Sequence, residues 1–299
     1  MNPLVSFVVP CYKLAHLLPE CVNSILGQTF RDFEILIMDD CSPDNTAEVA
    51  QSFKDERVKH IRNAPNLGHL RNYNKGISMA RGKYVWLISA DDRLRSQDVL
   101  RRYIELMENN DNVGFVFCPA IGVRDGKEDG LLKWTTCGKR SRIWPGRELL
   151  GKLVFRNCIA AASGLVRKEC YEKLGAFPLD LPYAGDWYMW CIFTLFYDAA
   201  YFAEPMIDYR LHELSMTSLL ARRRRMDDII AVPWRIRREA LKAGESVVAN
   251  RCLEAIAQHY GFCATAARFQ ASDYNLPLDE CENSMRERAT SSEELRSVR

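Results

Sequence analysis

Short apolar runs alternate with amphipathic stretches along residues 1–118. Each run has the length of a β-strand, and in each stretch apolar residues recur every three or four positions, the period of a helix. Because the runs are apolar almost throughout, they are typical of a parallel sheet that helices cover on both faces. We therefore predict an α/β fold with a doubly wound, mostly parallel sheet. Strands are expected at residues 5–10, 33–40, 57–61, 83–89 and 113–117, and helices at 16–28, from Ser42 or Asp44 onward, at 66–79 and at 96–107.

The pattern changes in the second half of the chain. Residues 121–136 are rich in Gly and Asp, which indicates a hairpin or a mobile loop, and a helical pattern resumes at Arg147. A strand-like segment follows at 160–167. The apolar stretch 187–202 is interrupted by two polar residues and is shorter than the roughly 20 apolar residues of a membrane span, so we expect it in the core.

We predict a helical extension after Leu219. The helical pattern continues to about Ala271 with an interruption at Pro233, and the tail from Glu282 is polar enough to be partly disordered. From Arg222 to residue 242 the chain holds eight Lys and Arg against three Asp and Glu, a local net charge of +5. One interpretation is a solvated helix face paired with acidic neighbours; the other is a helix that contacts anionic lipid at a membrane surface.

Composition narrows the classes of protein. The 299 residues are 47% hydrophobic and 27% charged, which excludes a disordered or fibrous chain. The net charge of +2 gives no overall attraction for a polyanion, so nucleic acid is not expected as a partner. The first residues, MNPLVSFVVPCYK, lack the basic region of a secretory signal, and the 11 cysteines are scattered without a CxxC pair. We expect a cytoplasmic protein with reduced thiols, and the alternative is a peripheral protein at the inner face of the membrane.

Polar residues follow three of the predicted strands. The first strand ends in Pro10 and Tyr12, the second in Asp39-Asp40 and the fourth in Asp91-Asp92. A single Asp pair after a strand is more often a helix cap or a turn, but two pairs at equivalent ends of one sheet indicate a site. Four carboxylates repel one another unless a cation or hydrogen-bond donors join them. Oxygen ligands at this density suit Mg²⁺ or Mn²⁺, and such a metal implies a phosphate ligand.

Two nucleotide-binding motifs are not supported. The spacing Gly146-x4-Gly151-Lys152 imitates a phosphate-binding loop, but Leu153 stands where Ser or Thr would hold magnesium, and no strand precedes it. No GxGxxG occurs, so the α/β pattern carries no dinucleotide fingerprint.

Taken in order and at their spacings, several segments resemble the family 2 glycosyltransferases, which have the GT-A fold. The resemblance covers residues 4–217 and is carried by VSFVVPCYK, SILGQTFRDFEILIMDDCSPDNT, NLGHLRNYNKGISMARGKYVWLISADD, GDWYMW and YRLHELSMT. It implies a GT-A domain over residues 1–218, with a nucleotide-sugar-binding half at 1–118 and an acceptor-binding half at 119–218. Residues 219–299 then form the helical region.

The resemblance also implies roles on the donor side. Pro10 and Tyr12 match positions that flank the nucleobase, and Asp40 matches a carboxylate that accepts a hydrogen bond from it, a combination suited to uracil. Arg71 corresponds to a basic residue near the diphosphate; the alternative is a solvated helix arginine.

A metal site follows from the same comparison of motifs. Asp91 matches the carboxylate on the ribose side and Asp92 the metal ligand of the family's DxD signature. Ala90 stands at the first acidic position of that signature, which leaves two carboxylates and suggests weaker affinity for metal. His212 matches a position that contacts the metal or the diphosphate in many relatives; the alternative is a polar residue with an ordinary partner.

Asp186 corresponds to the general base of the family, although Gly185 precedes it where an acidic residue is usual. The alternative for Asp186 is a carboxylate that caps the N-terminus of an apolar helix.

The resulting hypothesis is an inverting, metal-dependent glycosyltransferase that uses Mn²⁺ or Mg²⁺ and a nucleoside diphosphate sugar, with UDP-sugar favoured. Its acceptor is expected to be a surface polysaccharide, a lipid-linked saccharide or a small-molecule glycoside. Two alternatives are a sugar-phosphate nucleotidyltransferase, for which no Gly-rich, Lys-bearing loop is present, and an inactive nucleotide-binding partner of another transferase.

Overall fold

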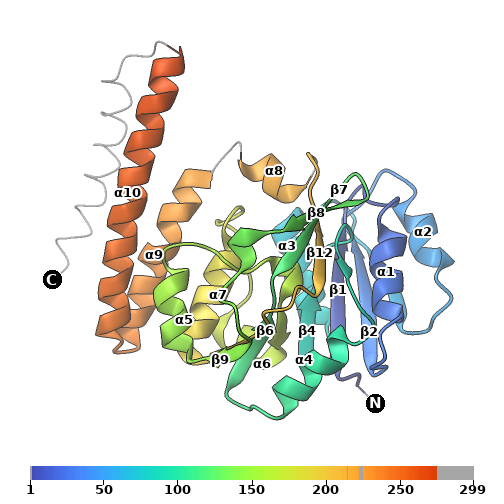
Figure 1. Ribbon diagram of the computed structural model, residues 1–299. Helices are drawn as coiled ribbons and strands as arrows, with labels where there is room; N and C mark the ends of the chain where they lie inside the picture. The colour runs from blue at the N-terminus through green and yellow to red at the C-terminus, as the bar shows by residue number, and fades with distance from the viewer. Residues whose placement is uncertain (1, 214, 222–224, 275–299) are drawn as a thin grey trace.

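The computed structural model describes residues 2–213, 215–221 and 225–274. Its main sheet has eight strands in the order β3-β2-β1-β4-β10-β6-β11-β9 (Figure 1). Strands β3, β2, β1 and β4 are parallel, whereas β10 is antiparallel to both of its neighbours, β4 and β6. The strands are β1 (Val5–Cys11), β2 (Phe33–Asp39), β3 (Val58–Arg62), β4 (Tyr84–Leu87), β6 (Val113–Phe117), β9 (Arg142–Trp144), β10 (Leu165–Arg167) and β11 (Asp198–Tyr201). The predicted doubly wound α/β fold is confirmed.

Helices cover both faces of this sheet, because alternate residues of each strand point to opposite sides. Along β1, Phe7 and Val9 pack into one apolar cluster and Val8 into the other, and all three are 0% exposed. The cluster around Phe7 is covered by α1 (Leu18–Leu26), α2 (Thr46–Ser52) and α4 (Val99–Glu108). The cluster around Val8 is covered by α3 (His69–Met79), α5 (Gly146–Leu153), α6 (Lys168–Leu174) and α7 (Gly185–Phe196).

A second sheet begins where β5 (Arg93–Leu94) follows β4 and β7 (Ala120–Arg124) follows β6. Its order is β5-β12-β7-β8, with β8 (Lys127–Leu131) and β12 (Ile207–Arg210). The hairpin of β7 and β8 confirms the hairpin expected at 121–136. Asp208 of β12 forms ion pairs with Arg93 and Arg95, which hold β12 beside the chain that leaves β4. Residues far apart in sequence, near positions 91 and 210, therefore meet at one place.

The C-terminal helices differ from the prediction at Pro233. α8 (Met216–Ala221) is followed by α9 (Arg225–Lys242) and α10 (Ser246–Tyr274), and α9 continues through Pro233 without a break. Proline removes one backbone donor, but its fixed φ is compatible with a helix. Val232 and Ile236 are 0% exposed on either side of it, so burial of this face supports the helix across the missing hydrogen bond. The turn comes instead at Gly244, whose φ is +75°.

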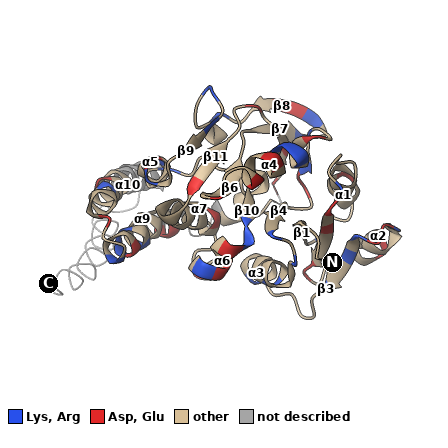
Figure 2. Ribbon diagram, turned by 90° about the horizontal axis from the view of Figure 1, so that it is seen from below, with Lys and Arg blue, Asp and Glu red and all other residues tan. Residues whose placement is uncertain are grey.

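α9 and α10 lie at the opposite end of the molecule from α1 and α2 (Figure 1) and pack on α5 and α7 as part of the same apolar cluster. Residues 222–224 of the basic segment and the tail from Glu282 lie outside the described residues. Figure 2 shows basic and acidic positions interspersed on α9, where Arg235 pairs with Asp180 and Lys242 with Glu239. Membrane contact through this segment stays a prediction, and none of the described helices is long and apolar enough to span a bilayer.

Contrary to the prediction, a strand does precede Gly146, because β9 ends at Trp144, and Gly146 begins α5, where packing requires a glycine. Its N–H donates to Asp198 Oδ1 at 2.8 Å. A Cβ at position 146 would lie 2.1 Å from the carbonyl oxygen of Tyr197 and 2.4 Å from that of Thr194, whereas a Cβ at Gly151 would meet no atom within 4 Å.

We therefore expect opposite effects of the same substitution at these two glycines of one helix. Gly146→Ala should lower the free energy of unfolding by about 1–3 kcal/mol, the usual cost of overpacking. Gly151→Ala should raise it by about 0.5–1 kcal/mol, because alanine loses less backbone entropy in a helix. Urea unfolding of both variants measures the difference, and equal stabilities would contradict the packing described.

Candidate functional site

A cavity of about 100 Å³ lies beyond the carboxyl ends of β1 and β4. The strand order places β2, β1 and β4 side by side, so the three polar strand ends predicted from the sequence do meet at one edge of the sheet. Residues from five further places complete the walls: α3, η2 (Ala161–Ser163), β12, α8 and the segment before α8. The lining residues are Pro10, Tyr73, Leu87, Ser89, Asp91, Asp92, Ala161, Ala162, Tyr209, Ser215, Met216 and Thr217.

A larger cavity of about 540 Å³ between α1 and β5 does not have the character of a reaction site. Its charged side chains pair with one another, as Arg93 does with Glu20 and Arg95 does with Glu128 and Asp208. The Arg93 pair joins the second sheet to α1, and the Arg95 pairs lie at the second sheet itself, so we regard them as structural.

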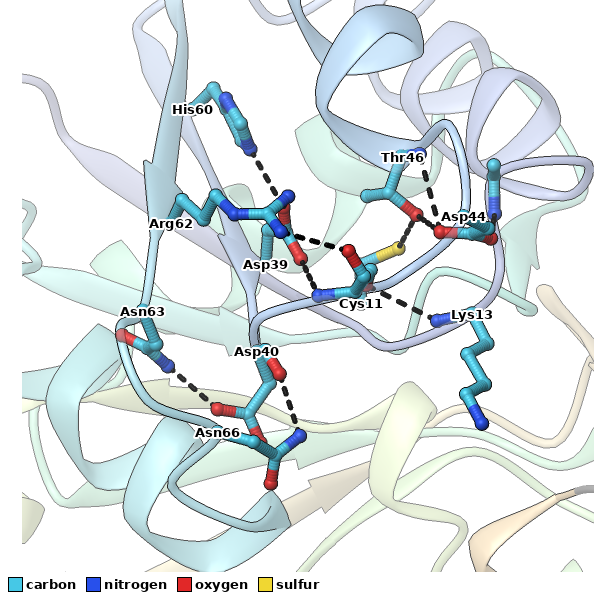
Figure 3. Close-up of polar contacts among 12 residues, drawn as sticks. Cys11, Lys13, Asp39, Asp40, Asp44, Thr46, His60, Arg62, Asn63 and Asn66 are labelled. Atoms are coloured by element: carbon cyan, nitrogen blue, oxygen red, sulfur yellow. Dashed lines mark hydrogen bonds and ion pairs between the residues drawn. The ribbon is translucent and has the colours of Figure 1, made fainter.

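Hydrogen-bond donors, and not a shared cation, offset the charges of Asp39 and Asp40 (Figure 3). Asp39 Oδ1 accepts from the N–H of Ser42 at 2.8 Å, and Oδ2 lies 3.1 Å from Arg62 and 3.2 Å from His60 Nε2. These partners come from β3 and from the loop after β2. Of the two ways in which the repulsion was expected to be offset, a cation or hydrogen-bond donors, this first pair uses donors of the protein itself.

Asp40 organises the loop that leads into α3. Its Oδ1 accepts from Asn63 Nδ2 at 2.9 Å and from the N–H of Leu67 at 2.8 Å, and its Oδ2 accepts from the N–H of Gly68 at 2.9 Å. Gly68 precedes α3 with φ +79°, a conformation that favours glycine. A carboxylate offers about four acceptor positions, so one on Oδ2 remains available.

Asp91 and Asp92 have far fewer partners. Asp92 is 5% exposed, and its Oδ1 accepts from the N–H of Arg210 at 2.9 Å. Asp91 Oδ2 lies 2.9 Å from His212 Nε2, whereas Asp91 Oδ1 is buried and, among the described residues, has no hydrogen-bond partner. Burial and the neighbouring Asp91 carboxylate raise the pKa of Asp92 well above its usual range. The Arg210 charge acts in the opposite direction on Asp92, but this pair has fewer direct hydrogen-bond partners than the first.

The donor set suits a metal that the substrate helps to hold. Within the described part of the chain, no three His, Cys, Asp or Glu side chains are arranged as a complete metal site. Mg²⁺ is commonly bound by one or two carboxylates together with water and substrate phosphates, and does not need an all-protein cage. The unpartnered oxygen of Asp91 and the single bond to Asp92 fit such an incomplete site. His212 Nε2 is engaged with Asp91, so only Nδ1 of this ring remains for another ligand.

Asp186 is the second residue of α7, and the N-cap position belongs to Ala184. The Asp186 carboxylate nevertheless accepts a backbone N–H of the first turn, so the structure is consistent with a helix-stabilising role as well as with a catalytic one. Asp186 Oδ1 accepts from the N–H of Trp187 at 2.7 Å, and Oδ2 accepts from Asn157 Nδ2 at 3.2 Å. Burial raises the pKa of Asp186 to about 6, although these two donors act in the opposite direction.

Two tyrosines that the sequence did not single out connect Asp186 with the Asp91-Asp92 pair. Burial raises the pKa of Tyr73 and of Tyr209, and the charges of all three carboxylates add to both shifts. Both phenols line the cavity, and Tyr209 Oη lies 3.0 Å from Thr217 Oγ1 at the start of α8. They occur within the motif segments NLGHLRNYN and YRLHELSMT, which were the available signal.

The remaining predicted residues lie around this centre. Pro10 lines the cavity, and Tyr12 follows β1 with 42% of its surface exposed. Arg71 lies in the first turn of α3 and is exposed, and the described residues include no ion-pair partner for it. The structure thus brings together Pro10, Asp91 and Asp92 in the cavity, with His212 bonded to Asp91. The other predicted residues do not line it: Tyr12, Asp40, Arg71 and Asp186.

The sequence was compared with models of known protein families and with known proteins, and it matches one family model. The family model described as Glycosyl transferase family 2 matches residues 6–174. An uncharacterized glycosyltransferase of Haemophilus influenzae is 28% identical over 217 residues, which cover 70% of this chain and 66%, less than two thirds, of that protein.

Two solved structures share the fold at 18% sequence identity. Staphylococcus aureus TarS 1-349, in complex with UDP-GlcNAc, has a TM-score of 0.70 and covers 94% of this chain and 77% of its own. The mannosyltransferase PcManGT from Pyrobaculum calidifontis, in complex with GDP-Man and Mn²⁺, has a TM-score of 0.57 and covers 90% of this chain and 81% of its own.

The difference between the two Asp pairs predicts opposite responses to the same isosteric change. Asp40→Asn turns an amide NH₂ toward at least one of the three donors and leaves it without an acceptor, so the free energy of unfolding should fall by about 1–3 kcal/mol. Asp91→Asn removes one of two adjacent buried charges, so the stability of the ligand-free protein at pH 7 should be unchanged or up to about 1 kcal/mol higher. Denaturant unfolding of both variants decides this. A loss at Asp91 as large as that at Asp40 would show that the second pair is also structural.

Proposed function

The chain belongs to the family 2 glycosyltransferases, and from that premise we propose that it transfers one sugar from a UDP-sugar, or another nucleoside diphosphate sugar, to an acceptor hydroxyl with inversion at the anomeric carbon. The proposed acceptors are a growing surface polysaccharide, a lipid-linked saccharide or a small-molecule glycoside. The observation that carries the proposal is a partner-poor carboxylate pair, Asp91 and Asp92, in a cavity whose Tyr73 and Tyr209 also feel the charge of Asp186, a partly buried carboxyl group of near-neutral pKa.

Asp92, with Asp91 beside it, would hold Mn²⁺ or Mg²⁺. When bound, such a metal supplies positive charge that stabilises the departing diphosphate. The unpartnered Asp91 Oδ1 supports this assignment, as does the Mn²⁺ complex of the mannosyltransferase neighbour. We assign Asp91 also to the ribose, and His212 to the metal through Nδ1, since its Nε2 is engaged with Asp91.

The nucleobase is assigned to the ends of β1 and β2. Pro10 and the exposed ring of Tyr12 offer an apolar surface on which a base can stack. The remaining acceptor position on Asp40 Oδ2 suits an N–H of uracil. Arg71, exposed and without an ion pair among the described residues, is assigned to the diphosphate, which a guanidinium can bind through two parallel hydrogen bonds.

Asp186 is assigned as the general base. A carboxyl group with a pKa of about 6 is ionised at neutral pH yet basic enough to accept a proton as the acceptor hydroxyl loses it. In the proposed reaction Asp186 takes this proton while the acceptor oxygen attacks the anomeric carbon from the face opposite the diphosphate. One bond forms as the other breaks, and inversion follows.

The alternatives have less support. The family match favours glycosyl transfer over nucleotidyl transfer. Ala90 and Gly185 would be consistent with an inactive nucleotide-binding partner. Such a protein, however, has no use for a carboxyl group whose pKa is raised to about 6, as that of Asp186 is. Donor hydrolysis separates the two cases, because an active transferase releases nucleoside diphosphate slowly into water and a pure binding protein does not.

Asp186→Asn should keep the fold and donor binding but lower turnover about 100-fold or more, the usual contribution of a positioned base. Nucleoside diphosphate release from a panel of UDP- and GDP-sugars identifies the donor in the wild type, and the variant is then compared on that donor. Near-normal release would exclude Asp186 as the base, and a transfer product that retains the donor's anomeric configuration would exclude single displacement.

The stability difference between the wild type and the same variant should depend on pH. The folded pKa of Asp186, about 6, lies above the unfolded value of about 3.9, so the unfolded chain loses the proton first as pH rises. This contribution to stability is present below about pH 4 and is lost by about pH 6. The stability of the wild type relative to Asp186→Asn should therefore fall by about 1–3 kcal/mol between pH 4 and pH 7.

A further inference from the structure

We propose that Asn157 is the positioning residue of Asp186: its side-chain amide holds one carboxylate oxygen and thereby sets both the orientation and the ionisation of the base. This inference rests on the proposed role of Asp186 as the general base. It concerns a residue outside the segments whose motifs carry the family resemblance.

The contact has a defined direction. Asn157 lies between the end of α5 and η2, and its Nδ2 donates to Asp186 Oδ2 at 3.2 Å. Its Oδ1 accepts from the N–H of Ile159 at 3.0 Å. A backbone N–H can only donate, so Oδ1 must face Ile159 and the NH₂ group must face Asp186. The amide therefore cannot flip without losing both hydrogen bonds.

The segment that carries Asn157 is anchored to α7 and to the core. Trp187, the residue after Asp186, donates from Nε1 to the carbonyl oxygen of Leu153 at 2.6 Å. On the other side of Asn157, Cys158 and Ile159 are 4% and 0% exposed. The Sγ atom of Cys158 lies 2.8 Å from that of Cys137. The end of α5 and the segment after it thus form hydrogen bonds with two consecutive residues in the first turn of α7.

These contacts divide the Asp186 carboxylate between two donors. Oδ1 takes the N–H of Trp187 and Oδ2 takes the amide of Asn157, so the carboxylate is held in one orientation and each oxygen keeps a free lone pair. Hydrogen bonds to the charged form favour ionisation and oppose the effect of burial. Without the Asn157 donor, a larger fraction of Asp186 would be protonated at neutral pH and unable to act as a base.

Other titratable groups near Asp186 do not replace this donor. Tyr73 from α3, Tyr209 from β12 and Cys191 from α7 interact with the Asp186 charge, and burial raises the pKa of each, so all three are neutral near pH 6. His259 of α10 packs against the Trp187 ring, and burial lowers its pKa. Asp228 of α9 accepts from the N–H groups of Tyr183 and Ala184 just before α7, and it is not a donor. Among the described residues, Asn157 is the side chain that donates to Asp186.

The direct test is a carboxyl carbon NMR titration of protein labelled with ¹³C in its aspartates. The Asp186 resonance is assigned by its absence from Asp186→Asn. We expect it to titrate near pH 6 in the wild type and about one pH unit higher in Asn157→Leu, the loss of a hydrogen bond to a charged group. Asn157→Asp, which replaces the donor with a like charge, should shift it further. The acid limb of kcat/KM for nucleoside diphosphate release should move by the same amounts and in the same order.

Asn109→Leu is the matched control, because Asn109 is the exposed C-cap residue of α4 and donates to the carbonyl oxygen of Glu105. It should leave the titration and the kinetic limb unchanged. An unchanged Asp186 titration in Asn157→Leu would overturn the proposal. If the Asn157 variants fail to fold, the side-chain ¹⁵N resonance of Asn157 in the wild type must still shift with a midpoint near pH 6, and a flat profile would also overturn it. Full turnover by Asp186→Asn, together with the expected titration shifts, would refute the base assignment but leave the contact.

Discussion

Two adjacent carboxylates repel each other more strongly as burial removes water, and the end of β4 holds Asp91 and Asp92 in that situation. The backbone imposes it: the N–H of Ala90 donates to the carbonyl oxygen of Pro10, and the N–H of Asp92 donates to that of Ser89. β12 then closes over the pair and contributes a backbone N–H and an imidazole. Even with the Arg210 charge nearby, the pKa of Asp92 stays raised, and this supports the proposal that a metal supplies further positive charge.

The surrounding structure is consistent with this interpretation because it treats its other carboxylates differently. Asp39 is offset by Arg62 and His60, and Asp40 by three donors of one loop. Among the described residues, Asp186 receives two neutral hydrogen-bond donors and no cation. These donors oppose the effect of burial, and the resulting pKa is about 6. Each carboxylate therefore has the partners that its proposed task requires: structural for Asp39, recognition for Asp40, metal binding for Asp92 and proton transfer for Asp186.

The sequence predicted what depends on local pattern. Continuous apolar runs located the parallel strands, and strand ends located the edge at which Asp40, Asp91 and Asp92 lie. The helix through Pro233 was missed because burial of Val232 and Ile236 outweighs one lost hydrogen bond. Tyr73, Tyr209 and Asn157 were missed for a different reason. Their significance comes from contacts between elements far apart in sequence, and no local pattern reports which side chains the packing will bring together.

The central claim is that Asp91 and Asp92 form half of a metal site that a nucleoside diphosphate completes. Calorimetric titration of UDP into the wild type, with Mn²⁺ and then with EDTA, tests it most directly. We expect affinity at least about tenfold higher with metal, or about 1.4 kcal/mol in binding free energy. In Asp92→Ala this difference should vanish, whereas Asp111→Ala, at a side chain 98% exposed, should keep it. Wild-type affinity that is the same with EDTA as with Mn²⁺ would contradict the claim.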